Sequence, residues 1–348
     1  LSYPFNVSGN AEGWHSLLAV PRMWLLLALW GLVMFILARR SPQLRRHRRE
    51  SLLFLTAYAA IAMVSITVTL RGLNGKFDTY RLRLPSLTAS FRSASPSTVG
   101  DATTFSVMLG DGYRITRLQG ASLHLLSLAP DVFHPSADPH LPITWVDGWH
   151  EGSDEPQVVA LSAEGRPVPN SIIANAQAPA VSANSEYVAF IREHQGRGSL
   201  LMKHIGSGSM PDGGEQLETT PDLDVWDHAF TPAGTLIISA AQGGAPALFL
   251  VHPGTAAAIS PLPLPKPARY PAISPDGKWL AFSHLEGGAW RLWLADTRTW
   301  SARPLTTTSC NALTPAWDSG SRQLTFASDC GRGLGLTALC RMPIWPVR

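Results

Sequence analysis

Three aspartates in the segment PDLDVWDHAF are the first side chains whose type and spacing could carry chemistry. Asp222, Asp224 and Asp227 place carboxylate oxygens at short intervals, and calcium prefers such ligands. A calcium loop also needs a central glycine and a distal glutamate, which this segment lacks. The three aspartates therefore do not predict a metal site.

Histidines and glycine-rich strings give no stronger signal. His134, His140 and His150 form the densest group of histidines, but their spacing fits no metal-binding pattern. The string GSGSM at 206–210 lacks the final glycine of a nucleophile elbow, and the glycines at 331–335 precede an expected strand rather than a helix. The sequence therefore selects no catalytic residue, no cofactor and no metal ion.

A repeated segment indicates which elements position these residues. PAISPDGKWLAF at 271–282 aligns without a gap with PAVSANSEYVAF at 179–190 and PAWDSGSRQLTF at 315–326, and HAFTPAGTLIIS at 228–239 is a weaker copy. The copies start 43 to 49 residues apart, close to the length of one four-stranded propeller blade. With weaker segments before them, the period predicts six blades that start near residues 90, 134, 179, 228, 271 and 315.

Each repeat describes two strands and the turn between them. A short apolar strand ends at a serine, Asp276 and Gly277 supply the turn, and an alternating strand ends on an aromatic residue that packs between sheets. The last blade lacks an outer strand after Cys340, and the segment TYRLRLPSL at 79–87 is available to supply it. Such a closure would remove the free edges of the ring.

The repeat resembles that of the TolB-type, WD-repeat-like propellers, which contain a Ser-Pro-Asp-Gly core followed by an apolar-Ala-Phe end. Residues 271–282 match this core closely, and residues 179–190 and 315–326 match it in part. The resemblance covers about 270 residues and implies an all-β six-bladed propeller. Proteins of this kind are mostly binding platforms, and the same propeller also accompanies prolyl-oligopeptidase-type hydrolases.

Cysteine and tryptophan add two expectations. Cys310 precedes the first strand of the last blade and Cys330 follows its second strand, so both lie on one face of the blade and predict a disulfide. Cys340 is expected to be a buried, unreactive thiol. Most tryptophans of the clear repeats should pack between blades, and Trp290 at a loop end is a candidate for a binding surface: Trp226, Trp279, Trp290, Trp293, Trp300 and Trp317.

Two uncharged runs precede the repeats. Residues 24–38 and 52–70 are long enough, with the lead-in of the first run, to cross a bilayer as helices. The hinge between them is rich in arginine, which is typical of a cytoplasmic loop. The arginines that determine this topology are Arg39, Arg40, Arg45, Arg46, Arg48 and Arg49.

These patterns divide the chain into four parts. We expect an extracytoplasmic N-terminal segment (1–20), a transmembrane helical hairpin with a basic cytoplasmic loop (21–71), a linker with the closing strand (72–89) and the propeller (90–348). Residues 1–77 carry nine Lys or Arg and two Asp or Glu, whereas the remainder carries 19 and 23, a net charge of −4. The basic character is therefore local and does not indicate nucleic-acid binding. The expected location is a bacterial inner membrane, with the propeller in the periplasm.

Two hypotheses about function remain open. The first is a membrane-anchored propeller that binds proteins or acts as a scaffolding subunit of a larger membrane complex, with contacts through a propeller face and through the helices in the lipid bilayer. The second is an enzyme. It would be either a propeller hydrolase with a site that the sequence does not reveal, such as a central carboxylate pair, or the C-terminal part of a polytopic membrane enzyme, since the chain begins with Leu1 rather than Met.

Overall fold

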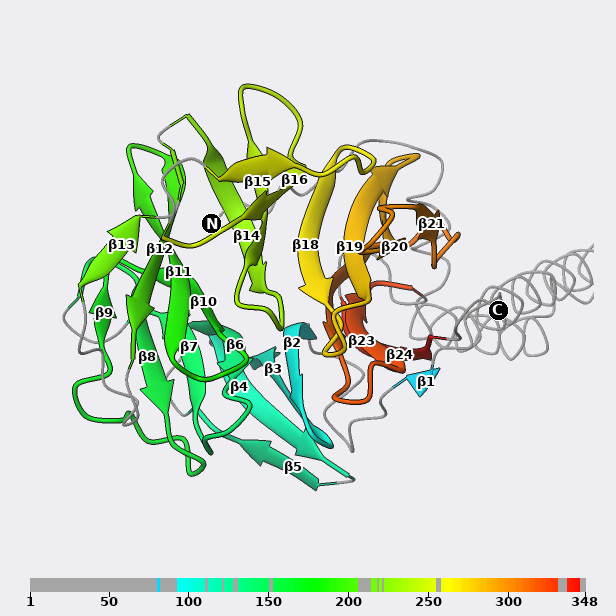
Figure 1. Ribbon diagram of the computed structural model, residues 1–348. Helices are drawn as coiled ribbons and strands as arrows, with labels where there is room; N and C mark the ends of the chain where they lie inside the picture. The colour runs from blue at the N-terminus through cyan, green and yellow to red at the C-terminus, as the bar shows by residue number, and fades with distance from the viewer. Residues whose placement is uncertain are drawn as a thin grey trace, which may run out of the picture. The chain divides into compact units, whose positions relative to one another are not determined.

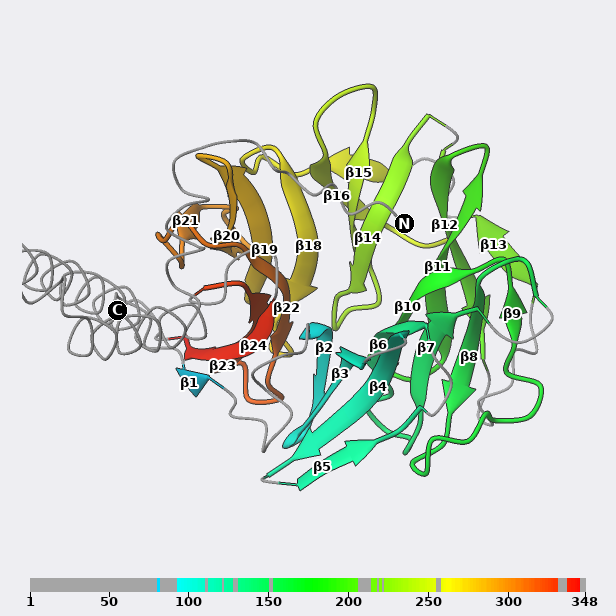
Figure 2. The ribbon, with the colours of Figure 1, turned by 180° about the vertical axis from the view of Figure 1, so that it is seen from behind.

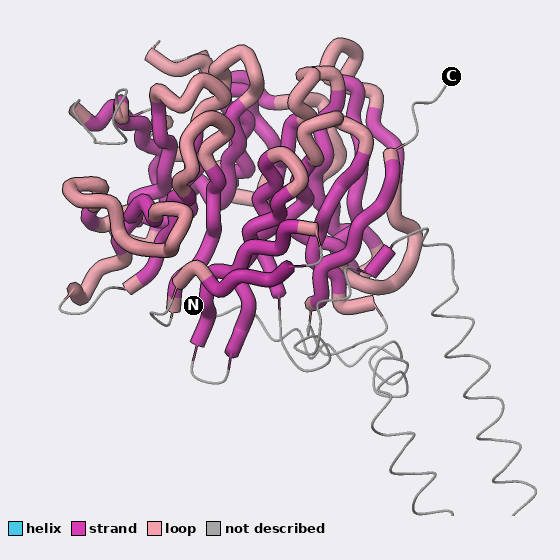
Figure 3. The backbone as a smooth tube through the Cα atoms, turned by 90° about the horizontal axis from the view of Figure 1, so that it is seen from below, coloured by secondary structure: helices cyan, strands magenta, loops and turns pink. Residues whose placement is uncertain are grey.

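The described part of the chain is built from strands and loops. The computed structural model describes residues 80–81, 93–109, 112–120, 122–127, 131–149, 153–205, 214–217, 219–220, 222–254, 258–330 and 337–344. Figure 3 shows only strands and loops in this part. None of its segments is a helix that could cross a membrane. The predicted hairpin at 21–71, with its six arginines, lies outside the described residues.

The strands form six antiparallel sheets of four strands each (Figure 1). Five sheets take four consecutive strands, and the sixth combines β22, β23 and β24 with β1. The strands of the first three sheets are β2 (Ser93–Val99), β3 (Ala102–Leu109), β4 (Gly112–Gln119), β5 (Ser122–Leu125), β6 (Val132–Ala137), β7 (Thr144–Gly148), β8 (Gln157–Leu161), β9 (Ile173–Ala174), β10 (Gln177–Val181), β11 (Tyr187–His194), β12 (Arg197–His204) and β13 (Glu215–Leu217). The others are β14 (Asp224–Phe230), β15 (Leu236–Ala241), β16 (Ala247–Val251), β17 (Ile259–Pro261), β18 (Ala268–Ile273), β19 (Trp279–Glu286), β20 (Ala289–Asp296), β21 (Ala302–Pro304), β22 (Ala312–Trp317), β23 (Gln323–Ser328), β24 (Ala338–Pro343) and β1 (Tyr80–Arg81).

The sheets are the blades of a ring. The first strand of each blade contacts the first strand of the next, in the cycle β2, β6, β10, β14, β18, β22 and back to β2. Figure 2 shows the same ring from behind, with these strands around its middle. The six-bladed propeller expected from the repeat period is therefore confirmed.

The hydrophobic core lies between the blades. Six clusters of buried apolar side chains each join two neighbouring sheets. The aromatic residue that ends the repeat, at Phe190, Phe282 and Phe326, is fully buried in each case. The cluster between the last and first blades is small, and Arg341 there lies 3.4 Å from hydroxyls of both Thr325 and Thr103.

The ring is closed by a segment from the N-terminal side of the chain. β1 pairs with β24, with Tyr80 opposite Arg341 and Arg81 opposite Cys340. The segment 79–87 thus supplies the outer strand of the last blade through two of its residues. The blade starts predicted at 134, 179, 228, 271 and 315 fall inside the first strands rather than at their beginnings. They do so because the repeat template begins inside the first strand, at or next to its register shift.

Candidate functional site

Every first strand contains a register shift that indicates a β-bulge. In β2, β6, β10, β18 and β22 the shift spans two residues, whereas in β14 it lies between Val225 and Asp227. In the five strands with the longer shift, a residue with positive φ precedes a proline there: Ser95, His134, Ala178, Tyr270 and Thr314. His228 of β14 aligns with these prolines in the repeat and follows the shift. Non-glycine residues adopt this backbone conformation at a cost of about 1–3 kcal/mol, so the surroundings must stabilise it.

Side chains of neighbouring blades provide part of that stabilisation. The N–H of Ser95 donates to Thr314 Oγ1 at 3.3 Å, and the N–H of Ala178 donates to Asp147 Oδ2 at 2.8 Å. The N–H of Tyr270 donates to Asp227 Oδ2 at 3.3 Å. The bulge thus directs a backbone donor toward the preceding blade, and a side-chain oxygen there accepts it. This arrangement ties the blades together around the middle of the ring.

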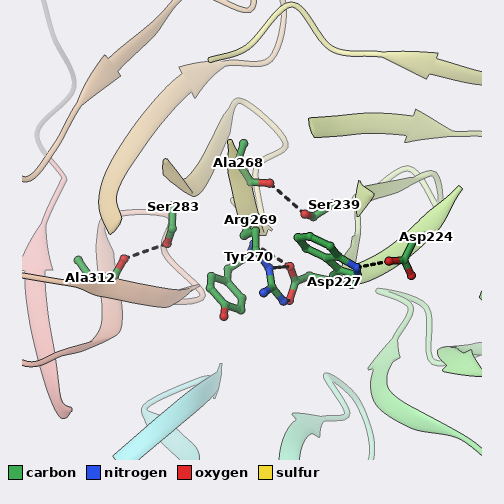
Figure 4. Close-up of polar contacts among 9 residues, drawn as sticks. Asp224, Asp227, Ser239, Ala268, Arg269, Tyr270, Ser283 and Ala312 are labelled. Carbon is green, nitrogen blue, oxygen red and sulfur yellow. Dashed lines mark hydrogen bonds and ion pairs between the residues drawn. The ribbon is translucent and has the colours of Figure 1, made fainter. Parts of the chain in front are cut away.

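Between the fourth and fifth blades the accepting carboxylate is ion-paired with an arginine (Figure 4). Arg269 donates from Nε to Asp227 Oδ2 at 2.9 Å and from Nη2 to Asp227 Oδ1 at 3.1 Å. The guanidinium lies 4.9 Å from the ring centre of Trp226 and 4.7 Å from that of Tyr270. The indole N–H of Trp226 in turn donates to Asp224 at 2.7 Å. A permanent cation is therefore held between two aromatic rings and a carboxylate.

Between the second and third blades a histidine takes the place of that cation. Nδ1 of His134 lies 3.0 Å from Asp147 Oδ2, the oxygen that also accepts the N–H of Ala178. Asp147 is buried, with 5% of its side chain exposed, whereas 43% of the His134 side chain is exposed.

The two junctions interact electrostatically. Burial alone would lower the pKa of His134, but the charge and hydrogen bond of Asp147 and the charge of Asp227 raise it, and Arg269 opposes them weakly. The net pKa of His134 lies above its ordinary value. Asp227 and Arg269 belong to the fourth and fifth blades and His134 to the second, so the charges that act on His134 include those of blades that are not its neighbours. We call His134, Asp147, Asp227 and Arg269 the axial cluster.

His228 differs from the prolines at its place in the other blades. Within the described part of the chain, neither ring nitrogen has a hydrogen-bond partner, and both are shielded from solvent. Burial lowers the pKa of His228 to about 4, although the nearby backbone of Ala189 and the carboxylate of Asp227 act in the opposite direction. His228 is therefore neutral near pH 7.

The two histidines should make the stability of the fold depend on pH in opposite directions. The raised pKa of His134 stabilises the fold fully below the unfolded value of 6.5, and this contribution is lost as pH rises through the folded pKa. The lowered pKa of His228 destabilises the fold as pH falls from 6.5 toward 4. We expect His134→Gln, which retains His228, to lose roughly 1–2 kcal/mol of stability between pH 7 and pH 5. His228→Ala should gain stability on acidification, as measured by urea unfolding. Parallel pH profiles of the two variants would contradict this assignment.

Hydroxyl groups near these junctions have structural partners. Ser239 donates to the carbonyl of Ala268 and Ser283 donates to the carbonyl of Ala312, each at 2.9 Å (Figure 4). Both bonds join one blade to the next. Neither serine is bonded to a histidine, so neither has the base that activates a serine nucleophile. Among the described residues, no group of three His, Cys, Asp or Glu side chains could hold a metal ion.

The aspartates singled out in the sequence have separate partners. Asp222 accepts a hydrogen bond from the amide of Gln242, Asp224 accepts from the N–H of Gly198 as well as from Trp226, and Asp227 pairs with Arg269. They do not converge on one point.

The remaining candidates of the sequence occupy structural positions. Asp276 accepts a hydrogen bond from the N–H of Lys278 at 3.2 Å, and Gly277 has a φ of +72° at the turn before β19. Cys310 and Cys330 are disulfide-bonded, and Cys340 is free and buried. Trp290 packs edge-on against Tyr270 with ring centres 6.4 Å apart.

Sequence reasoning singled out Asp227 and His134 separately but did not predict the axial cluster. The X-Pro pair of the bulge, which occurs at Ser95-Pro96 and at His134-Pro135, was a further signal. These pairs mark the bulges of the first two blades, where the rest of the repeat is weak. The partnership of His134 with Asp147 joins two strands and has no signal in the local sequence.

Comparisons with known proteins identify the fold. No protein-family model matches the sequence, and no curated protein matches it. Among solved structures, TolB from Acinetobacter baumannii has a TM-score of 0.53 and 15% identity, over 83% of this chain and 69% of that one. The β-propeller domain of the Trilobed protease from Pyrococcus furiosus has a TM-score of 0.50 and 9% identity, over 73% of this chain and 93% of that one. A puromycin hydrolase mutant complexed with PGG has a TM-score of 0.50 and 13% identity, over 68% of this chain and 50% of that one.

These similarities define the class of the protein as a six-bladed β-propeller with a TolB-like fold. The identities are too low to carry function with them, and the similar structures include both TolB and propeller-containing hydrolases. Function must therefore be argued from this chain's own residues.

Proposed function

We propose that the protein is a membrane-anchored, extracytoplasmic propeller that binds a protein partner as a subunit of a larger membrane complex. The observation that carries the proposal is how the polar groups of the axial cluster are used. Asp147 and Asp227 each accept a backbone N–H from the next blade while pairing with a cation. These groups hold the ring in one shape, as a recognition platform requires, and are not arranged for proton transfer to a nucleophile.

The rest of the proposal comes from the sequence. Two uncharged runs flank an arginine-rich hinge, and this pattern favours a hairpin anchor with both outer ends on the exterior side. A disulfide between Cys310 and Cys330 suits an oxidising compartment. A rigid ring tethered in this way exposes its loops to partners outside the cytoplasm.

Cysteine labelling tests the location of the propeller. Ser122 is exposed at the start of β5, and Ser41 belongs to the arginine-rich hinge. In intact cells whose outer membrane is permeable to the reagent, a maleimide that cannot cross the inner membrane should label Ser122→Cys at least tenfold more than Ser41→Cys. Lysis should equalise the two. Labelling of Ser41→Cys in preference to Ser122→Cys would place the propeller in the cytoplasm and overturn the proposal.

Native purification tests the subunit role. The full chain, extracted from its own membranes in mild detergent, should migrate as a complex together with other proteins. Extraction at several detergent concentrations controls for loss of weak partners. Migration as a monomer under all of these conditions would contradict a subunit function.

A further inference from the structure

Four large side chains of the first two blades form a partly exposed patch. Met108 is 42% exposed and Trp149 is 38% exposed. The rings of Tyr113 and Phe133 lie 5.0 Å apart, and those of Phe133 and Trp149 lie 6.4 Å apart, edge to face. Met108 is opposite Tyr113 in the β3–β4 pair, so the two side chains lie on the same face of the sheet. We call Met108, Tyr113, Phe133 and Trp149 the aromatic patch.

The patch lies at one side of the ring. Met108 and Tyr113 flank the connection from β3 to β4, Trp149 begins the connection from β7 to β8, and Phe133 is at the start of β6. In an antiparallel blade, connections between second and third strands all lie on the side where the first strand begins. Large apolar side chains exposed together in this way are typical of an interaction surface.

Three exposed carboxylates are close to the patch along the chain. Asp131 is exposed two residues before Phe133, and Asp154 and Glu155 are exposed in the connection that contains Trp149. In the described part of the chain none of these three carboxylates forms an ion pair. Arg114 on β4, which follows Tyr113, is partly buried, and the ring of His134 lies 6.1 Å from that of Phe133. The described side chains that are both exposed and charged next to the patch in sequence are therefore acidic.

The negative charge of these carboxylates indicates which kind of partner could bind the aromatic patch. An anionic lipid surface would be repelled by the three carboxylates. A second copy would also be repelled, because residues 78–348 carry 19 basic and 23 acidic side chains. A Lys- or Arg-rich segment is attracted by the carboxylates, and its cations can lie over the exposed face of an aromatic ring.

We propose that the aromatic patch is a docking surface for a basic, extended segment of a partner protein. The segment's Lys or Arg side chains contact Trp149 and Phe133, and their charged ends face Asp131, Asp154 and Glu155. This inference rests on the binding function proposed above and names the surface and the chemistry of its partner.

Peptide binding to the purified full chain in detergent tests the proposal. The probe is a fluorescein-labelled hexa-arginine peptide, with labelled hexaglutamate as the charge control, followed by fluorescence anisotropy at about 100 mM salt. Trp149→Ala should weaken hexa-arginine binding about tenfold, which corresponds to the loss of one good cation–π contact. The double variant Asp154→Lys and Glu155→Lys should weaken it at least as much. The matched control is Ile172→Ala, which removes an apolar side chain that is 58% exposed next to the outer strand β9 and does not belong to the patch.

The pH dependence gives a second measurement. His134 faces Asp147 from β7, Asp227 and His228 from β14 and Arg269 from β18, and it lies beside the patch. Its protonation adds a positive charge there, so hexa-arginine binding should weaken as pH falls from 8 to 6. His134→Gln should remove this dependence. A pH dependence that is unchanged in His134→Gln would contradict the placement of the cations beside the patch.

Other outcomes would overturn the proposal. Equal binding by Trp149→Ala, Ile172→Ala and the unaltered chain would show that the patch is not used. Preference for hexaglutamate would contradict the partner's charge. Trp149-dependent binding to vesicles with 30% phosphatidylserine, without hexa-arginine binding, would assign the patch to lipid. Peptide binding is measured on the isolated chain, so its failure is distinct from a failure of the labelling and purification experiments.

Discussion

Phe282→Ala is expected to lower the free energy of unfolding by about 4 kcal/mol. Phe282 is fully buried and packs in the cluster that joins the fourth and fifth blades, with Leu262 and Leu280 among its neighbours. Removing a buried phenyl ring loses its transfer free energy and leaves a cavity that both blades can fill only in part. Equilibrium urea unfolding of the full chain in detergent, followed by tryptophan fluorescence, measures the change.

Two variants control this measurement. Phe282→Leu retains most of the apolar volume and should cost much less than the alanine variant. Ile172→Ala removes a side chain that is mostly exposed and should change stability by less than about 0.5 kcal/mol. A loss below about 1 kcal/mol for Phe282→Ala would show that the contact between these blades does not limit the stability of the ring.

Asp227→Ala should lower the free energy of unfolding by about 2–3 kcal/mol. The substitution removes the two carboxylate oxygens that accept from Arg269, one of which also accepts the N–H of Tyr270. Arg269 would then remain between two aromatic rings as a partly buried cation without its carboxylate. The side chains of Asp227 and Arg269 are 16% and 26% exposed. Solvent can therefore hydrate the remaining charge in part, and the expected loss of stability is smaller than for a fully buried pair.

The exposed pair of Asp276 and Lys278 is the matched control. Their side chains are 36% and 71% exposed, and an ion pair at such a position contributes at most about 1 kcal/mol. The double variant Asp227→Ala and Arg269→Leu should recover part of the loss, because it removes the partly buried cation together with its carboxylate. Equal losses for the single and double variants would show that the ion pair itself is not the source of the effect.

The fold could be predicted because each blade repeats one pattern. Asp276 and Gly277 mark a turn of the required geometry, and Phe190, Phe282 and Phe326 recur at the end of an alternating strand. Both signals are local, and their period equals the length of a blade. The missing outer strand of the last blade was also apparent, since a ring built of equal blades leaves one strand unaccounted for.

The axial cluster could not be predicted in the same way. Asp147 belongs to the second strand of its blade, and its partners belong to first strands before and after it. Arg269 and Asp227 are separated by a whole blade of sequence. Such pairs depend on the angle at which blades meet and on the bulge that directs a backbone N–H sideways. Neither the angle between blades nor the direction of that N–H can be predicted from the spacing of residues within one repeat.

The short strand β1 has a mechanical consequence. Tension applied upstream of Tyr80 is transmitted to the ring through two paired residues, Tyr80 with Arg341 and Arg81 with Cys340. Because these two residue pairs form few hydrogen bonds, β1 should detach under a small load. The apolar layers between the other blades should withstand the same load. β1 would then separate from the last blade while the remaining sheets keep their shape.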